Sequence, residues 1–204
     1  KINFLLSVFG VEELKTVKKL NLKVLKIPSG EINNTPLLKY IAKMNKKIIL
    51  SSGMANLNEV EVAIKILKKN GLGNKKITVL QCTTDYPTQL KDVNLNAMIT
   101  MKKKFKVEVG LSDHTTGSIA AVSAVALGAK VIEKHITINN NLEGPDHKAS
   151  LNPKKFKEFV KNIRNVEILM GSHLKKPTKP ELKNKKIVRK SIVASINIKK
   201  GDKF

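Results

Sequence analysis

The chain has 204 residues and a formal charge of +23, from 39 lysines and arginines against 16 acidic residues. Apolar residues make up 41% of it, enough to bury a core, which argues against a wholly disordered chain. A single cysteine, Cys82, excludes an intramolecular disulfide and a cysteine-cage zinc site. No apolar run approaches the ~20 residues that cross a bilayer, and the start lacks a small-residue cleavage pattern. We therefore expect a cytoplasmic protein with no membrane partner.

The high positive charge suggests nucleic acid as a partner, but the predominance of lysine over arginine argues against it. Only Arg164 and Arg189 are arginines, and arginine is the residue suited to bidentate base and phosphate recognition. Aromatic residues are 4% of the chain, with no tryptophan, so a base-stacking platform is poorly supplied. We expect a solvated lysine surface and no nucleic acid, although an anionic substrate would be drawn to such a surface.

A short apolar run followed by an amphipathic helical pattern repeats six times along the chain. The runs are nearly continuously apolar, as strands covered on both faces should be. They are Ile2–Ser7, Lys23–Ile27, Lys47–Ser52, Ile77–Gln81, Val107–Ser112 and Lys130–Ile136. The predicted helices are Val11–Leu20, Pro36–Met44, Leu57–Asn70, Val93–Phe105, Ser118–Leu127 and Lys154–Met170.

Six consecutive βα units predict an α/β fold with a parallel sheet, either an open doubly wound sheet or a (β/α)8 TIM barrel. The usual nucleotide loops of doubly wound sheets, GxGxxG and GxxxxGK[ST], do not occur. Polar residues cluster at the C-terminal ends of nearly every run, which favours a barrel, whose site draws on all strands at one face. A barrel needs eight strands, so the sequence resembles a barrel without its first two βα units.

The character of the chain changes after Met170, where prolines and lysines replace the apolar pattern. We therefore predict a barrel domain over 1–172 and a linker over 173–187. Residues 188–204 would begin a second domain with a strand, SIVASINI, and a turn, KKGD.

Two histidines follow neighbouring strands, His114 in LSDHTTG and His135 in VIEKHI. Alternation along the second run places Glu133 and His135 on one side and Lys134 on the other. Because adjacent parallel strands end at the same edge, the two imidazoles should meet and form half of a divalent-metal site. Water or substrate oxygens would complete the shell. The alternative, one capping and one buried hydrogen-bonded histidine, stays open.

Other strand ends also carry polar residues. KIPSGE places Lys26, Ser29 and Glu31 on a tight turn, a plausible anion cradle. Ser51, Thr84 and Tyr86, and Asp146 on a glycine–proline turn, follow later runs. Each alone fits an ordinary turn, but several polar strand ends in register favour a site.

Taken together, KIPSGE, ILSSGMANL, CTTDYP, GLSDHT, VIEKHIT, GPDHKASL and VRKSIVA resemble the sialic acid synthase family, most closely its legionaminate-type branch. The resemblance covers essentially the whole chain. It implies a TIM barrel followed by an antifreeze-like (SAF) domain, and a homodimer. It also implies condensation of phosphoenolpyruvate with an N-acetylmannosamine-type sugar, with release of phosphate.

The resemblance also implies roles for individual residues. A divalent ion, Mn²⁺ or Mg²⁺, would bind His114 and His135. The catalytic and sugar-binding candidates are Glu31, Tyr86, Glu133 and Asp146. The candidates for binding phosphoenolpyruvate are Ser7, Lys26, Ser29, Ser51, Thr84 and Ser112.

Several departures from the family pattern bear on activity. Ser7 replaces a threonine, Val8 a proline and Gln81 a histidine. The family's first two strands, with a catalytic acid and lysine, have no counterpart here, and the SAF domain is cut short. If the polypeptide truly ends at both termini, we expect it to lack full activity. A non-catalytic polyanion-binding barrel and a metal-dependent pyruvate aldolase are the competing hypotheses.

Overall fold

A parallel sheet forms the centre of the protein, as the repeated βα pattern predicts. The computed structural model describes residues 2–203 and divides into two units, which meet in the sequence between Met170 and Gly171. In the first unit, five strands lie in the order β1-β2-β3-β4-β5 and every neighbouring pair is parallel. The strands are β1 (Val24–Ile27), β2 (Lys47–Ser51), β3 (Ile77–Cys82), β4 (Glu108–Asp113) and β5 (Val131–Lys134).

The strand order decides between the two predicted layouts. A doubly wound sheet reverses its order at a switch point, whereas successive strands of a barrel lie side by side in chain order. Here each strand neighbours its predecessor without exception, which is the barrel arrangement. The described sheet has five strands, so it is an open part of such an arrangement.

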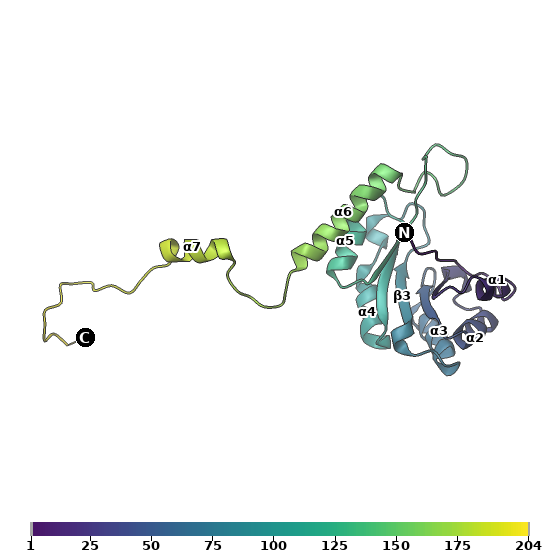
Figure 1. The fold of residues 1–204 in the computed structure, drawn as a ribbon, viewed down its shortest axis with the longest axis horizontal. Helices are drawn as coiled ribbons and strands as arrows, with labels where there is room; N and C mark the ends of the chain where they lie inside the picture. The colour runs from purple at the N-terminus through teal and green to yellow at the C-terminus, as the bar shows by residue number, and fades with distance from the viewer. Residues whose placement is uncertain (1, 204) are drawn as a thin grey trace. The chain divides into compact units, whose positions relative to one another are not determined.

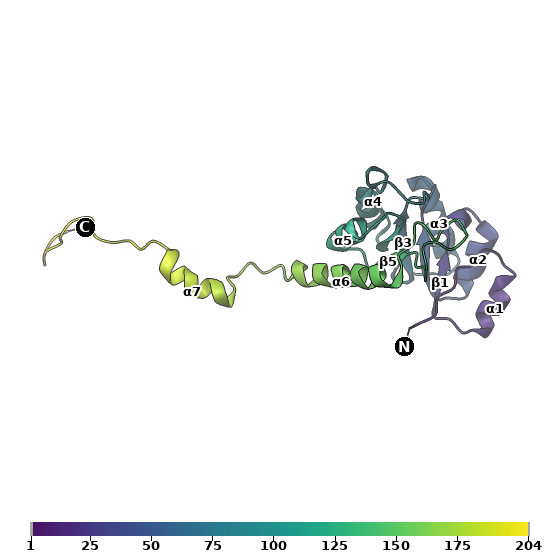
Figure 2. The ribbon, with the colours of Figure 1, turned by 90° about the horizontal axis from the view of Figure 1, so that it is seen from above.

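The helices follow the strands at the predicted places and lie on one side of the sheet. They are α1 (Glu13–Lys19), α2 (Thr35–Lys43), α3 (Leu57–Lys69), α4 (Leu95–Phe105), α5 (Ile119–Ala126) and α6 (Pro153–Met170). Figure 1 shows them beside the strands, and in Figure 2 they follow one another around the strands in chain order. Short 3-10 turns occur at Ser29–Glu31, Asn74–Lys76 and Leu90–Asp92.

Helix starts match the capping signals in the sequence. Asn34 accepts a hydrogen bond from the backbone N–H of Leu37, and Pro36 lies in the first turn of α2. Asn56 and Glu59 form a reciprocal capping box at the start of α3. These caps satisfy backbone donors that a helix end otherwise leaves free, which fixes where each helix begins.

The first apolar run, Ile2–Ser7, is not a strand, so the prediction of six strands is wrong by one. It makes only an isolated bridge, in which Ser7 pairs with Lys26 of β1. The Val8 N–H donates to the Lys26 carbonyl at 3.0 Å, and the Lys26 N–H donates to the Leu6 carbonyl at 3.1 Å. Ile2 is 96% exposed, because no described element covers the beginning of the run.

The two faces of the sheet differ in chemistry. The outer face, toward the helices, carries fully or almost fully buried aliphatic side chains at Leu25, Ile27, Ile48, Leu50, Ile77, Val79, Val109 and Leu111. The strand registers place another set on the opposite, inner face, near the C-terminal ends of the strands: Lys26, Ser51, Cys82, Ser112 and Glu133. The outer face therefore holds the core, and the inner face is left for polar chemistry.

The second unit contains one helix, α7 (Lys179–Val188), which begins at a capping box of Thr178 and Glu181. It occupies much of the segment predicted as a linker. The predicted strand SIVASINI is not formed, and every described side chain after Met170 is exposed. A lone strand cannot satisfy its backbone groups by pairing, which accounts for the difference.

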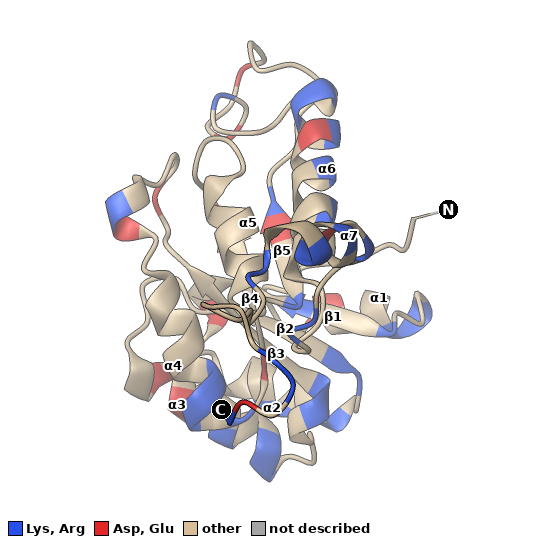
Figure 3. Ribbon diagram, turned by 90° about the vertical axis from the view of Figure 1, so that its left-hand side faces the viewer, with Lys and Arg blue, Asp and Glu red and all other residues tan. Residues whose placement is uncertain are grey.

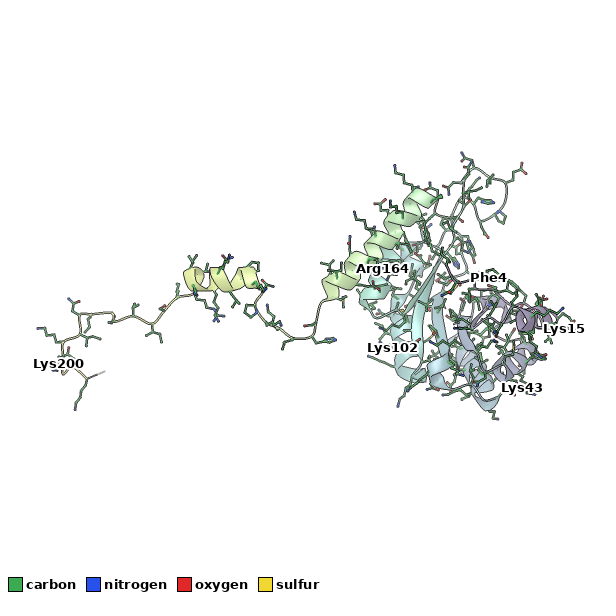
Figure 4. All side chains as sticks on the ribbon, in the orientation of Figure 1. Phe4, Lys15, Lys43, Lys102, Arg164 and Lys200 are labelled. Atoms are coloured by element: carbon green, nitrogen blue, oxygen red, sulfur yellow. The ribbon has the colours of Figure 1, made fainter. Side chains whose placement is uncertain are left out.

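The positive charge is spread over the first unit and does not gather on one element. Figure 3 shows lysines and arginines on most of its helices. In Figure 4, Lys15, Lys43, Lys102 and Arg164 lie on four different helices. This distribution fits a solvated surface better than a nucleic-acid groove. Among residues 2–203, no helix is both long and apolar enough to cross a bilayer.

Gly110 provides a test of the β4–β5 pairing. A Cβ at this position would overlap the Val131 carbonyl oxygen and lie 2.7 Å from a Leu80 methyl carbon. Gly110→Ala should therefore lower the free energy of unfolding by about 1–3 kcal/mol, measured by urea denaturation. Gly73→Ala is the matched control, because its Cβ would meet nothing within 4 Å. Equal stability of the two variants would contradict the described pairing.

Candidate active site

Residues from opposite edges of the sheet meet on its inner face. Lys26 belongs to β1 and Glu133 to β5, yet Lys26 Nζ lies 3.5 Å from Glu133 Oε1. Four inter-strand spacings of ~4.8 Å would separate these strands by about 19 Å in a flat sheet. The sheet is therefore strongly curled, and its inner face is a trough with side chains converging from several strands.

A buried cation, the ammonium of Lys26, lies in the trough near the Glu133 carboxylate and the Ser112 hydroxyl. Ser112 Oγ donates to Glu133 Oε1 at 2.7 Å. Lys26 is 4% exposed, and its second polar contact is a long one, 3.3 Å to the Ile27 carbonyl. Burial lowers the pKa of Lys26, and the Glu133 carboxylate opposes this by favouring the charged ammonium. An ammonium with loose partners can still bind an anion.

The segments at the ends of β1, β2 and β3 lie close together beside this cation. Ser29 Oγ accepts from the Gly53 N–H at 2.9 Å and donates to Cys82 Sγ at 3.5 Å. Gly53 is required here, because a Cβ would overlap Thr84 Oγ1 and lie 2.7 Å from Ser29 Oγ. The strand ends of β1, β2 and β3 are thus packed closely enough for their hydroxyls to share one bound group.

Ser51 has an unsatisfied hydroxyl. Its Oγ is buried and, among the described residues, has no hydrogen-bond partner. A buried polar group without a partner costs about 1–3 kcal/mol unless a ligand or water satisfies it. Because Ser51 lies on the inner face at the end of β2, this hydroxyl is a candidate for contact with a molecule bound in the trough.

The two predicted histidines meet at the end of the trough. The rings of His114 and His135 have centroids 5.2 Å apart and lie nearly perpendicular, at 86°. Tyr86 packs against both, with centroid distances of 4.2 Å and 5.5 Å. The prediction that the two imidazoles converge is confirmed.

The hydrogen bond of His114 determines which of its nitrogens is free. Nδ1 lies 2.8 Å from the Thr83 carbonyl, and since a carbonyl can only accept, Nδ1 carries the proton. Nε2 is then left as a lone-pair donor. Burial disfavours charge on this ring, but contacts with the Cys82 sulfur and the Thr83 carbonyl outweigh it and raise the pKa of His114. A histidine oriented through Nδ1 by a backbone carbonyl is the usual arrangement of a metal ligand.

His135 is in a different environment. Burial lowers its pKa, and the neighbouring His114 lowers it further. Its Nδ1 lies 3.7 Å from Asp146 Oδ2, which brings the predicted Asp146 to the edge of the site. The neutral imidazole is the form that binds metals. Within residues 2–203, no group of three or more His, Cys, Asp or Glu side chains is arranged to hold an ion, so this pair is at most a partial ligand set.

Most of the predicted residues lie in this arrangement. Ser7 forms a backbone bridge with Lys26, which places it beside this part of the site. Glu31 is different, because its carboxylate accepts a hydrogen bond from Asn34 at 2.6 Å, at the start of α2. Among the described residues, no side-chain hydrogen bond or ion pair joins Glu31 to the other candidates. The sulfur of Cys82, which is not among the predicted site residues, lies between Ser29 and His114, 4.0 Å from Nδ1 of the latter.

The charge of Glu133 should control the proton on Lys26. Glu133→Gln removes the interaction that raises the Lys26 pKa and leaves the lowering effect of burial. We expect the Lys26 pKa to fall further, measured by NMR titration of ¹³C-labelled lysine. Glu31→Gln is the control, because Glu31 does not contact Lys26. An unchanged Lys26 titration in Glu133→Gln would contradict the described contact.

Comparison with known proteins places this site in a family. Residues 1–175 match the NeuB family. The chain is 54% identical over 203 residues to N,N'-diacetyllegionaminic acid synthase of Campylobacter jejuni, covering 100% of this chain and 61% of that protein. It is 36% identical over 204 residues to human N-acetylneuraminate-9-phosphate synthase, covering 98% and 56%. The chain thus spans about 60% of the length of these curated relatives.

Solved structures agree with this relationship. The sialic acid synthetase of Leptospira borgpetersenii superposes with a TM-score of 0.79 at 32% identity, covering 91% of this chain and 65% of that one. DAHP synthase of Thermotoga maritima superposes with a TM-score of 0.69 at 20% identity, which shows a shared fold alone. Together with the trough and its paired histidines, the match over residues 1–175 shows that this chain belongs to the NeuB family.

Proposed function

We propose that this protein condenses phosphoenolpyruvate with an N-acetylated amino sugar of the N-acetylmannosamine type and releases phosphate. The new bond joins C3 of phosphoenolpyruvate to the aldehyde carbon of the sugar, and water adds to C2 as phosphate leaves. The product is a nonulosonate, an acidic nine-carbon sugar. The observation that carries the proposal is the meeting of Lys26 and Glu133 across the trough, directly beside the histidine pair.

The cationic part of the trough suits phosphoenolpyruvate. This substrate is a small trianion, and it needs positive charge and hydrogen-bond donors in fixed positions. Lys26 would supply the charge, and the candidate hydroxyl donors are Ser7, which pairs with Lys26 through the backbone, and Ser29, Ser51, Thr84 and Ser112 at the strand ends of the trough. The unsatisfied hydroxyl of Ser51 supports this assignment, because a bound anion would supply its missing partner.

The histidine part suits a divalent cation and the sugar. Nε2 of His114 and a ring nitrogen of His135 would hold Mn²⁺ or Mg²⁺, with the remaining positions filled by water or sugar oxygens. Such an ion, when bound, polarises the aldehyde oxygen of the sugar. Tyr86 packs on both rings and limits how a sugar can lie, and Asp146 offers a carboxylate at the open side. Glu133 offers a carboxylate that contacts Lys26 and Ser112.

We propose that the curled sheet is part of an eight-stranded barrel, with two further βα units between the Ile2–Ser7 run and β5. The strong curl and the unpaired sides of both elements support this. We likewise propose the division into a barrel (1–172), a linker (173–187) and the start of an SAF domain (188–204). A homodimer in the cytoplasm completes the proposal. The motifs that resemble the sialic acid synthase family support all three.

Loss of either histidine should abolish the activity. We expect His114→Ala and His135→Ala each to lower the rate at least 100-fold, because each removes half of the protein's ligands to the ion. The assay measures phosphate release from phosphoenolpyruvate with Mn²⁺ and N-acetylated amino sugars. It uses the chain together with all flanking sequence that its gene encodes. His173→Ala, an exposed histidine of the second unit, is the control.

The same assay separates the competing functions. A pyruvate aldolase would form product from pyruvate and release no phosphate. A polyanion-binding module would bind nucleic acid in a salt-sensitive way that does not depend on phosphoenolpyruvate. Full activity in both histidine variants would contradict the metal role.

Phosphoenolpyruvate binding should depend on the charge of Lys26. Lys26→Met should weaken binding roughly 10- to 100-fold, the effect of losing about 1.5–3 kcal/mol of charged hydrogen bonding. Because burial lowers the Lys26 pKa below 10.5, affinity should be highest at low pH values within the stable range. It should fall as pH rises through that lowered pKa. Calorimetric titration between pH 7 and 10 measures this, with exposed Lys15→Met as control. Equal affinity in Lys26→Met would exclude Lys26 from the site.

A further inference from the structure

A buried ion pair lies behind the two histidines, on the outer face of the sheet. Asp113 and Lys134 are register partners at the last step of the β4–β5 ladder. Lys134 Nζ lies 3.0 Å from Asp113 Oδ2, and their side chains are 2% and 0% exposed. Neither residue is among the predicted site residues, because both point away from the trough.

The pair is closed to any ligand. Asp113 Oδ1 accepts from the Thr115 N–H at 2.9 Å and from the Thr115 hydroxyl at 2.8 Å. Lys134 Nζ also donates to the Thr115 carbonyl and lies 5.7 Å from the centroid of the Phe159 ring on α6. Both carboxylate oxygens and the ammonium are therefore occupied. Such a closed cluster fixes backbone positions and binds nothing further.

The location of the pair connects it to the site. Asp113 directly precedes His114, and Lys134 directly precedes His135. Through Thr115, the cluster also holds the residue that follows His114. On the inner face one step earlier, Ser112 and Glu133 make a second link between the same strands. The strand ends that carry the two histidines are thus tied together on both faces.

These ties matter because β5 has a described partner strand on one side only. Among the described strands only β4 pairs with it, over four register positions. Its four residues are all half-buried, whereas those of β3 are buried throughout. Backbone pairing on one side leaves the end of such a strand more open to fraying. Just beyond β5, the Leu151 N–H donates to the His135 carbonyl at 3.0 Å and holds the backbone there. The side-chain links at the last step of the β4–β5 ladder add to this contact and set where the end of β5 lies relative to His114.

We propose that Asp113 and Lys134 are positioning residues that hold the His114 and His135 rings in contact. The inference about ring geometry stands on the described contacts. Its consequence for metal binding rests on the proposed function. A buried ion pair is weak evidence of stabilisation, because desolvation offsets most of the attraction. Its effect is therefore expected in the geometry of the rings more than in the melting temperature.

The test compares three variants of the 204-residue chain with the parent chain. Lys134→Met removes the ammonium and keeps an unbranched side chain. The double variant Asp113→Leu with Lys134→Met replaces the pair by apolar side chains and leaves no buried charge unpaired, so it folds even where the single variant does not. Lys104→Met is the matched control, because Lys104 pairs with Glu61 at 2.7 Å on the partly exposed α3–α4 surface, away from the histidines.

Two measurements separate the inference from the proposed function. The first, without metal, is the NOE between the labelled rings of His114, His135 and Tyr86. We expect these NOEs to be lost in Lys134→Met and in the double variant and kept in Lys104→Met. The second is Mn²⁺ affinity, measured by EPR, which should weaken about 10- to 100-fold in the same two variants, as when support of a metal ligand is removed.

Each outcome has one meaning. Unchanged ring NOEs in the folded double variant overturn the inference, whatever the metal does. Lost NOEs in a chain whose parent binds no Mn²⁺ uphold the positioning role and contradict the proposed metal. Lost NOEs with unchanged Mn²⁺ affinity show that the ring contact is not what the ion requires, and that outcome overturns the link between the pair and metal binding.

Discussion

The contact between Lys26 and Glu133 is the constraint on which the rest of the site depends. It joins the first and last strands of a five-stranded sheet, so it can exist only if the sheet curls into a trough. The same curl brings the ends of all five strands around one space. Right-handed twist and helix packing on one face supply the curvature, and the aliphatic outer face supplies the burial that maintains it. A flat sheet with the same side chains would keep the histidine pair of neighbouring strands but hold Lys26 of β1 far from Glu133 of β5.

Within the trough, the chemistry divides into two halves that share a boundary. On one side a buried ammonium and several hydroxyls are the groups proposed to bind an anion, and on the other two imidazoles are proposed as half of a cation site. Cys82 and Glu133 lie between them. Cys82 contacts both Ser29 and His114, and Glu133 contacts both Lys26 and Ser112. In the reaction proposed above, the phosphate of one substrate and the aldehyde of the other would be held a short distance apart, and proximity of this kind can account for much of an enzyme's rate enhancement.

The sequence predicts those parts of this structure that depend on local patterns. Continuous apolar runs predicted β1 to β5, because strands buried on both faces leave a clear signal in the sequence. Amphipathic patterns and capping residues predicted α1 to α6. The same patterns failed to predict the structure of Ile2–Ser7 and SIVASINI, where strand formation depends on partners that no local pattern supplies.

In the candidate site, the histidine pair was predictable from strand order alone. The Asp113–Lys134 pair was missed, although alternation places both on the outer face and opposite charges at neighbouring strand ends were a readable signal. The Glu31 side chain has a local partner, since Asn34 lies three residues on and its amide donates to the Glu31 carboxylate at the start of α2. The role predicted for Glu31 stays a prediction.

Two lysine–carboxylate pairs join strands of this sheet, Lys134 with Asp113 and Lys26 with Glu133. They differ in how fully their hydrogen-bonding groups are occupied, and this difference distinguishes a structural pair from one that can bind a ligand. Lys134 makes short contacts, its carboxylate partner is fully occupied, and an aromatic ring covers its remaining side. Lys26 is as deeply buried, but its two contacts are long, at 3.3 and 3.5 Å, and an unpartnered hydroxyl lies on the next strand. Burying a charge is costly unless strong partners compensate, so a loosely held buried ammonium is a group whose best partner is missing. The first pair can hold the histidines in place because nothing remains for it to bind. The second can receive an anion because its own contacts leave that need unmet.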